Sequence, residues 1–199
     1  MARPAGRFRP GGLEWPFPNR TPLAAMTLMI AGLVLFLGAH SIRIYAEGWR
    51  TARLAAMGEM GWKAAYSVVS LVGFVLICYG YGLSRETPVD LFNPPVWTRH
   101  LAALITLPAF ILVVAGQIPG TYIKQAVKHP MVLGTKAWAL AHLLANGRLA
   151  DVILLGSILV WAILSFKAAR GRDKAQGLTY PAKRSEERRV GKECRSRWS

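Results

Sequence analysis

Long apolar runs separated by short polar connections dominate the chain. They cover residues 26–45, 64–83, 100–118, 131–145 and 150–166. A helix needs about 20 residues to cross a bilayer, and the shortest crossings have about 17. The runs are continuous rather than alternating, which favours membrane helices over the strands of a membrane barrel. The pattern therefore predicts an all-α, polytopic transmembrane helical bundle with about five membrane segments.

The run over 131–145 is the weakest of these segments. Because it is shorter than a normal crossing, we expect it to be short, tilted or shielded by its neighbours. It ends at Asn146 and Gly147, which are typical of a helix C-cap. The segment before it contains Pro108, a predicted kink, and stops at Pro119.

Basic residues are distributed unequally between the two sides that these segments predict. One side receives Arg43, Arg50, Arg53, Lys63, Lys124, Lys128, Lys167, Arg170, Arg172 and Lys174. The other side receives Arg85, Arg99 and Arg148, and we expect Arg85, Glu86, Asp90 and Arg99 to form a solvated loop. Since cytoplasmic loops carry the excess of Lys and Arg, the first side is predicted to be cytoplasmic and Met26 to start outside.

The composition indicates one membrane unit, because 53% of the 199 residues are hydrophobic. The formal charge of +15 is typical of nucleic-acid partners, but much of it lies at the two ends of the chain. We therefore expect the lipid bilayer as a partner and no nucleic acid, and the oligomeric state stays open. The remaining positive charge lies in loops, where membrane topology explains it.

Both ends of the chain are set apart from the membrane unit. Residues 184–199, RSEERRVGKECRSRWS, match the translation of a common sequencing adapter, and we expect read-through there and a missing native C-terminus. They hold six Lys/Arg and three Glu, so omitting them lowers the charge from +15 to +12. Residues 1–25 are rich in Pro, Gly and Arg, which is typical of a disordered lead or an upstream start. Their four Arg and one Glu lower +12 to +9.

Four histidines are the main carriers of chemistry. Two of them, His129 and His142, lie in the stretch HPMVLGTKAWALAHLLANG, while His40 and His100 lie in or beside other apolar runs. Ionisable groups at such positions are costly and usually face a bundle interior or a ligand. His129 precedes His142 by thirteen residues, about 220° around a helix, so a straight helix cannot point both at one spot.

A metal-bound cofactor is one interpretation of these histidines. A neutral imidazole at His40 can ligate a metal, and Arg43 beside it suits a propionate or a phosphate. Zinc is disfavoured because the chain has only Cys78 and Cys194 and no carboxylate in these segments. Haem needs only one or two axial imidazoles in an apolar cavity. The alternative is that the histidines bind backbone carbonyls or lipid headgroups.

The chain resembles the NnrU family of membrane proteins over residues 26–181. The resemblance rests on GLVLFLGAHSIRI at His40, WTRHLA at His100, the block PGTYIKQAVKHPMVLGTKAWALAHLLANG and the segment DVILLGSILVWAILSFKAARGRDKA. It implies a multi-pass protein of the bacterial inner (plasma) membrane that is associated with nitrite and nitric-oxide metabolism in denitrification. Members usually continue with a further helix, so a C-terminal helix is expected to be missing.

The relatives of this family include zeta-carotene isomerases, which use haem b to isomerise a cis double bond. By that resemblance haem b is the expected cofactor, His40 and His142 are the candidate axial ligands, and His129 is an exchangeable ligand or a structural partner. Arg43 joins them as a cofactor-binding residue. Segment depth instead pairs His40 with His129, and His142 with His100, because two axial nitrogens lie only about 4 Å apart.

Three functions follow from these observations. The first is a haem- or nitric-oxide-binding accessory protein of denitrification. The second is a haem-dependent cis-trans isomerase of a carotenoid or another apolar polyene. The third is a structural membrane subunit without a cofactor, which would tolerate the loss of His40 and His142. A polyene and nitric oxide would both bind in an apolar cavity near iron, so the sequence does not separate the first two functions. Whether the chain is an enzyme stays open.

Overall fold

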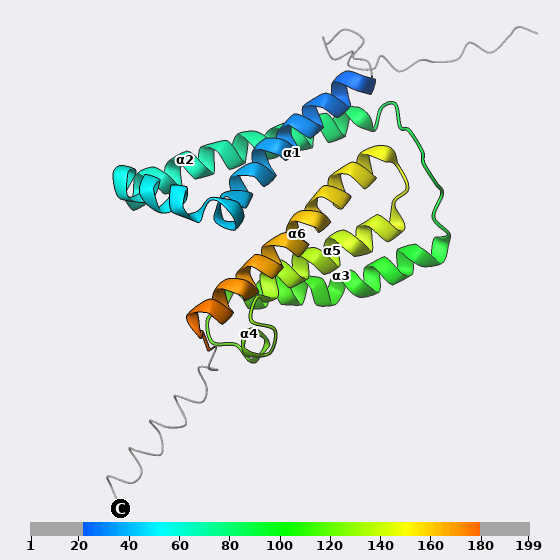
Figure 1. Ribbon diagram of the computed structural model, residues 1–199. Coiled ribbons are helices and arrows are strands. Elements are labelled where there is room, and N and C mark those ends of the chain that lie inside the picture. The colour runs from blue at the N-terminus through cyan, green and yellow to red at the C-terminus, as the bar shows by residue number, and fades with distance from the viewer. Residues whose placement is uncertain (1–21, 180–199) are drawn as a thin grey trace, which may run out of the picture.

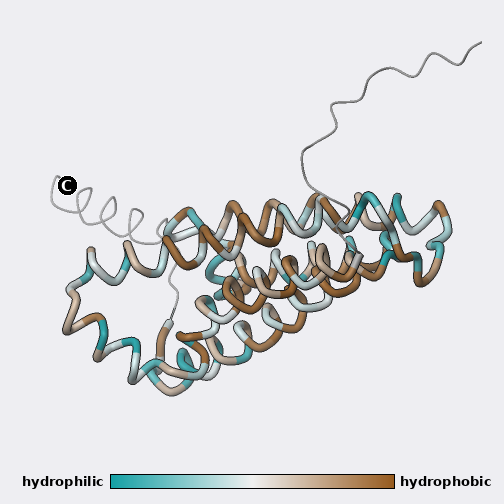
Figure 2. Tube along the Cα trace, turned by 90° about the horizontal axis from the view of Figure 1, so that it is seen from above, coloured by the Kyte–Doolittle hydropathy of each residue, from teal (hydrophilic) through white to brown (hydrophobic). Residues whose placement is uncertain are grey.

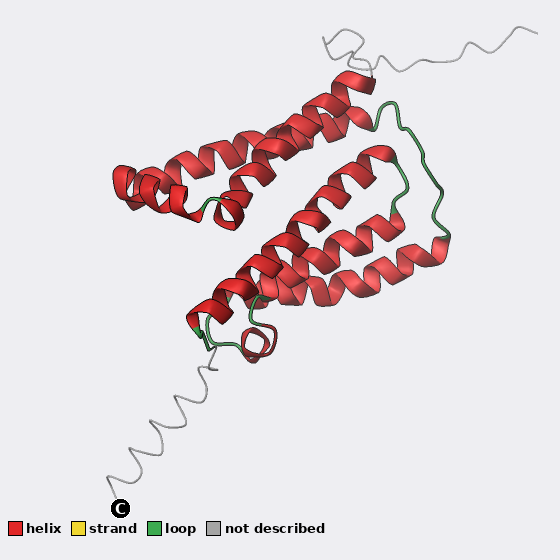
Figure 3. Ribbon diagram, in the orientation of Figure 1, coloured by secondary structure: helices red, strands yellow, loops and turns green. Residues whose placement is uncertain are grey.

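The computed structural model describes residues 22–179, and both the N-terminal lead before this range and the adapter-like segment 184–199 lie outside it. The described part is built from helices alone (Figure 3), which confirms the all-α prediction. The helices are α1 (Pro22–Tyr45), α2 (Glu47–Ser84), α3 (Val96–Gln117), α4 (Tyr122–Val127), α5 (Pro130–Ala145) and α6 (Leu149–Gln176).

The long helices form two groups that meet at α1 and α6. Helices α1 and α2 form an antiparallel pair, while α5 lies between α3 and α6 (Figure 1). Small residues allow the close approach in the first pair. A Cβ atom on Gly32 would lie 2.6 Å from the Ile77 nitrogen, and one on Gly73 would lie 2.8 Å from the Phe36 nitrogen. Tight contact between small residues is the usual way in which membrane helices associate.

The contact between α3 and α5 uses the same device. A Cβ atom on Gly134 would lie 2.5 Å from the Ala109 carbonyl oxygen, and one on Gly116 would lie 2.7 Å from the Met131 Cβ. Pro108 lies inside α3, one residue before this contact. The second half of α3 is therefore held close to the first turns of α5, and the groove between the two helices lies toward the start of α3 and the end of α5.

Four helices are long and apolar enough to cross a membrane, namely α1, α2, α3 and α6. The chain is thus a multi-pass membrane protein. Segment 131–145 forms the 16-residue α5, which spans about 24 Å at 1.5 Å per residue. Its position between α3 and α6 agrees with the expectation of a short, shielded segment. Apolar side chains such as Val34 (67% exposed) and Leu104 (68%) face outward, as lipid contact requires.

Helix α2 begins earlier than the apolar pattern predicts. The run over 64–83 indicates a single crossing, but the helix starts at Glu47 and bends at Gly58, which has φ 73° and ψ 168°. This positive φ is strained for residues other than glycine. The part before Gly58 carries Arg50 and Arg53, and an i,i+3 ion pair between Arg50 and Glu47 (2.8 Å) supports it. Hydropathy alone did not reveal this polar part of α2 between Glu47 and Gly58.

The two ends of the bundle differ in charge. We call the end with the α1–α2 turn, α4 and the close of α6 the basic end, and the other the opposite end (Figure 1). Most of the residues that were predicted on the cytoplasmic side belong to the basic end, in the α1–α2 turn, in or after α4 and in the last turns of α6. Arg85, Arg99 and Arg148 lie just after α2, in the first turn of α3 and just before α6, at the opposite end. Apolar residues fill the helices between them (Figure 2).

Candidate functional site

A groove between α3 and α5 contains one of the predicted ligands, His142. It is an open groove with a volume of about 650 Å³, within the range of about 300–1,000 Å³ that is usual for ligand sites. Its lining residues are Arg99, Ala102, Ala103, Thr106, Leu107, Phe110, His142, Ala145 and Asn146. Alanines on α3 leave the space and larger apolar side chains bound it. We call this pocket the His142 groove.

The imidazole of His142 is oriented by its own helix. Its Nδ1 lies 3.0 Å from the carbonyl oxygen of Trp138, one turn earlier, and the Trp138 ring lies 4.9 Å away. Because a carbonyl only accepts hydrogen bonds, Nδ1 is the protonated nitrogen of the neutral ring and Nε2 keeps its lone pair. Metal-ligating histidines are held in this way, with the second ring nitrogen donating to a carbonyl.

A more polar pocket of about 580 Å³ adjoins the His142 groove at the opposite end. It is lined by Arg85, Asp90, Leu91, Phe92, Asn93, Pro94, Arg99, Ala145, Asn146, Gly147, Arg148 and Asp151. The two pockets share Arg99, Ala145 and Asn146. We call this pocket the arginine mouth. The two therefore lie side by side, with mostly apolar side chains lining the His142 groove and charged side chains lining the arginine mouth.

Backbone pairing fixes the rim of the arginine mouth. The Leu91 amide donates to the Gly147 carbonyl (2.9 Å), and the Leu149 amide donates to the Val89 carbonyl (2.8 Å). Gly147 has no room for a side chain, because a Cβ atom there would overlap the Phe92 carbonyl. The α2–α3 connection is therefore fastened to the α5–α6 connection, and the Asn146-Gly147 stop serves this contact as well as ending α5.

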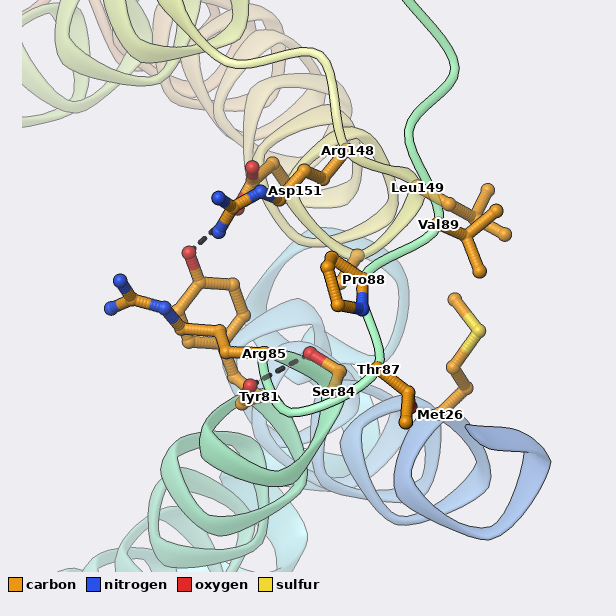
Figure 4. Close-up of a pocket in the computed structure, with 11 residues that line it drawn as sticks. Met26, Tyr81, Ser84, Arg85, Thr87, Pro88, Val89, Arg148, Leu149 and Asp151 are labelled. Carbon is orange, nitrogen blue, oxygen red and sulfur yellow. Dashed lines mark hydrogen bonds between the residues drawn. The ribbon is translucent and has the colours of Figure 1, made fainter. Parts of the chain in front are cut away.

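A buried carboxylate lies beside the same mouth. The Tyr81 hydroxyl donates to Asp151 Oδ1 at 2.6 Å and joins α2 to the first turn of α6, with Arg85 and Arg148 beside Tyr81 (Figure 4). Asp151 is only 5% exposed. It lies in the first turn of α6, a position that the helix dipole favours for an acidic side chain. The pair fixes where α2 and α6 meet.

His40 lies in a different setting, packed among aromatic rings where α1, α2 and α6 meet. Its Nδ1 lies 2.7 Å from the Phe36 carbonyl oxygen. The rings of Phe36, Tyr66 and Trp161 lie 4.2, 5.3 and 5.8 Å from its own. Trp161 Nε1 is buried and has no hydrogen-bond partner among the described residues. We call this set of four side chains the His40 cluster.

The structure separates His40 from His142 in depth. His142 lies three residues before the end of α5, and so about 5 Å from the opposite end of the bundle. His40 is level with Trp161, which lies twelve residues into α6 and so about 18 Å from that end. Two axial nitrogens on one iron would be about 4 Å apart. The helix pairing thus places the two predicted ligands in separate surroundings.

The remaining predicted site residues lie at the basic end. His129 caps the start of α5, and its Nε2 lies 2.8 Å from Oδ2 of Asp173, which is 6% exposed. This contact ties α5 to α6, in keeping with a structural partner. Arg43 is exposed, and its carbonyl accepts from Arg172 Nη1 at 3.3 Å. Neither residue lines the His142 groove.

The residues present fit haem better than a multi-ligand metal ion. Within residues 22–179 no three His, Cys, Asp or Glu side chains are grouped to hold a metal. A haem site requires fewer protein ligands, namely one oriented imidazole together with apolar walls and space for the macrocycle. The His142 groove has all three.

Sequence reasoning missed three residues of this region. Arg99 was expected in a solvated loop, but α3 starts at Val96, so Arg99 lies in its first turn and lines both pockets. Proline at positions 94 and 95 was the available signal for that start. Tyr81 lies near the end of the apolar run 64–83, and Asp151 lies at the start of the run 150–166. Their similar depth in the membrane was the available signal for a contact between them.

Comparison with known proteins gives one result. A family model described as NnrU protein matches residues 28–192. No curated protein and no solved structure matches the chain.

Proposed function

The chain belongs to the NnrU family, and on that premise we propose that it is an inner-membrane protein that binds haem b through His142 in the groove between α3 and α5. The observation that carries the proposal is the orientation of His142. Its Nδ1 is engaged with the Trp138 carbonyl, and its Nε2 is left as a ligand beside a pocket of about 650 Å³. The basic end faces the cytoplasm, as the excess of Lys and Arg indicates.

The chain's own residues have separable tasks in this proposal. His142 would hold the metal, and the Trp138 carbonyl would keep its ring in the ligating tautomer. Leu107 and Phe110 exclude water from the apolar wall. A bound haem would supply an iron that changes oxidation state and binds a small diatomic ligand. The family name supports nitric oxide as that ligand and an accessory role in denitrification.

A second function is favoured by the exposure of the groove wall. Leu107 is 65% exposed and Phe110 is 58% exposed, so an apolar molecule in the bilayer can reach the groove from the side. A cis-polyene is such a molecule, and a haem-dependent isomerase would use the same His142 site. This function requires substrate conversion, whereas the accessory function requires only ligand binding.

The experiment is a haem determination on the protein purified in detergent after expression with added haem precursor. We expect a Soret band and a pyridine haemochrome near one haem per chain. His142→Ala should lose both. His100→Ala changes an exposed histidine at the same end that does not line the groove, so it serves as the matched control and should retain both. Absence of haem from the wild-type protein would contradict the proposal and favour a structural subunit. If haem is present, nitric-oxide binding and cis-polyene conversion are then measured separately.

A further inference from the structure

The arginine mouth holds more positive charge than its own carboxylates neutralise. Of its two acidic residues, Asp151 is engaged by Tyr81. Asp90 forms only a long, exposed pair with Arg148 Nε (3.7 Å, with the Arg148 and Asp90 side chains 44% and 72% exposed), which another anion can displace at little cost. Over residues 22–179 no carboxylate lies within ion-pair distance of Arg85 or Arg99. Guanidinium groups recognise carboxylates and phosphates with paired hydrogen bonds. The mouth is thus suited to an anion.

The position of this charge selects the kind of anion. Arg99 lines both pockets, so an anionic group that it binds can continue into the apolar His142 groove. A small inorganic anion would leave the groove unused. A molecule with an apolar body and carboxylates at one edge fills both pockets, and haem b has this form because its two propionates lie on one edge of the macrocycle.

We propose that Arg99 and Arg148 bind the haem propionates and so orient the macrocycle with its propionate edge toward the opposite end of the bundle. This inference rests on the proposed function and deepens it. It replaces Arg43, the partner that the sequence suggested, because Arg43 lies at the basic end and away from the His142 groove. The same anion chemistry is offered by a phospholipid phosphate, and the experiment separates the two.

The test compares haem b with its dimethyl ester, in which both propionate charges are removed. Haem-free protein in phosphatidylcholine nanodiscs is titrated with each compound, and the Soret band is followed. Arg99→Gln and Arg148→Gln should each weaken haem binding by about tenfold, the size expected for a lost charged hydrogen bond. Neither should change binding of the ester. Arg99→Lys keeps the charge and should recover part of the affinity.

Arg53→Gln, at the basic end, is the matched control and should leave both affinities unchanged. Equal binding of haem by wild type and both glutamine variants, with dependence on His142 retained, would overturn this inference and leave the proposed function standing. Absence of binding by either compound to the wild-type protein would overturn both. If phosphatidylglycerol lowers haem affinity in the wild type but the glutamine variants bind haem normally, the anion is the lipid phosphate and the inference is wrong.

Discussion

His40 and His142 have the same local geometry and different surroundings. In both, Nδ1 donates to the carbonyl four residues earlier, at 2.7 Å and 3.0 Å, so each keeps Nε2 as a possible ligand. His142 borders a groove of about 650 Å³, whereas His40 is packed against the rings of three helices. The comparison teaches that the tautomer of a membrane histidine prepares it for ligation, while the packing of neighbouring helices decides whether a ligand has room.

The largest expected difference is in haem content, when each of the two histidines is replaced by alanine in a separate variant. His142→Ala should reduce the haem content at least tenfold, because the axial nitrogen is lost. His40→Ala should keep the haem content within about twofold, because His40 lies about 13 Å deeper than His142. Pyridine haemochrome measured per mole of folded protein decides this. Equal loss in both variants would show that both rings reach the iron.

Two matched glycine variants should disturb the His142 groove and the His40 cluster separately, and only the first should strongly lower haem affinity. Gly134→Val places a side chain against the Ala109 carbonyl, forces α3 from α5, and should lower haem binding by about tenfold or more. Gly73→Val acts at the backbone of Phe36, a member of the His40 cluster, and should destabilise the α1–α2 pair, since overpacking costs about 1–3 kcal/mol. Its effect on haem affinity should be smaller. Haem titration and thermal unfolding of both variants test the contrast.

Tyr81→Phe should weaken the frame of the arginine mouth without touching the His40 cluster. The buried Asp151 would lose its 2.6 Å hydrogen bond, and a buried group left unsatisfied costs about 1–3 kcal/mol. Thermal unfolding in detergent measures the loss. Tyr45→Phe, at a tyrosine of α1 that is 71% exposed, is the control. Unchanged stability of the Tyr81 variant would show that water replaces the hydroxyl.

Trp161→Phe should have the smallest effect. The indole Nε1–H is buried and unpartnered among the described residues, so its removal relieves a desolvation cost that offsets part of the lost apolar contact. We expect a change within about 1 kcal/mol in the free energy of unfolding. A much larger loss in chemical denaturation would indicate that a ligand or an ordered water binds this N–H in the His40 cluster.

The sequence predicted what local patterns encode. Continuous apolar runs located the long helices, and the Asn146-Gly147 pair marked the end of α5. The Lys and Arg residues of the connections were assigned to two sides of the membrane. His142 was identified because an imidazole inside an apolar run is unusual. These features depend on residues close together in the chain.

The rest depended on contacts between distant segments. The start of α2 at Glu47 lies in a polar stretch, so hydropathy did not reveal it. The Tyr81–Asp151 bond joins residues seventy positions apart. The role of Arg99 depends on the start of α3 and on its packing against α5. The pairing of α1 with α6 also brings His40 to the level of Trp161. The composition of the two helices does not determine which of their residues lie at the same level.

Electron paramagnetic resonance of the ferric protein tests most directly whether His142 alone binds the haem. With one protein imidazole on the iron, the spectrum should be high-spin, it should disappear in His142→Ala, and His40→Ala should leave it unchanged. A low-spin signal typical of two imidazoles, lost in either variant, would contradict the separation of His40 from His142.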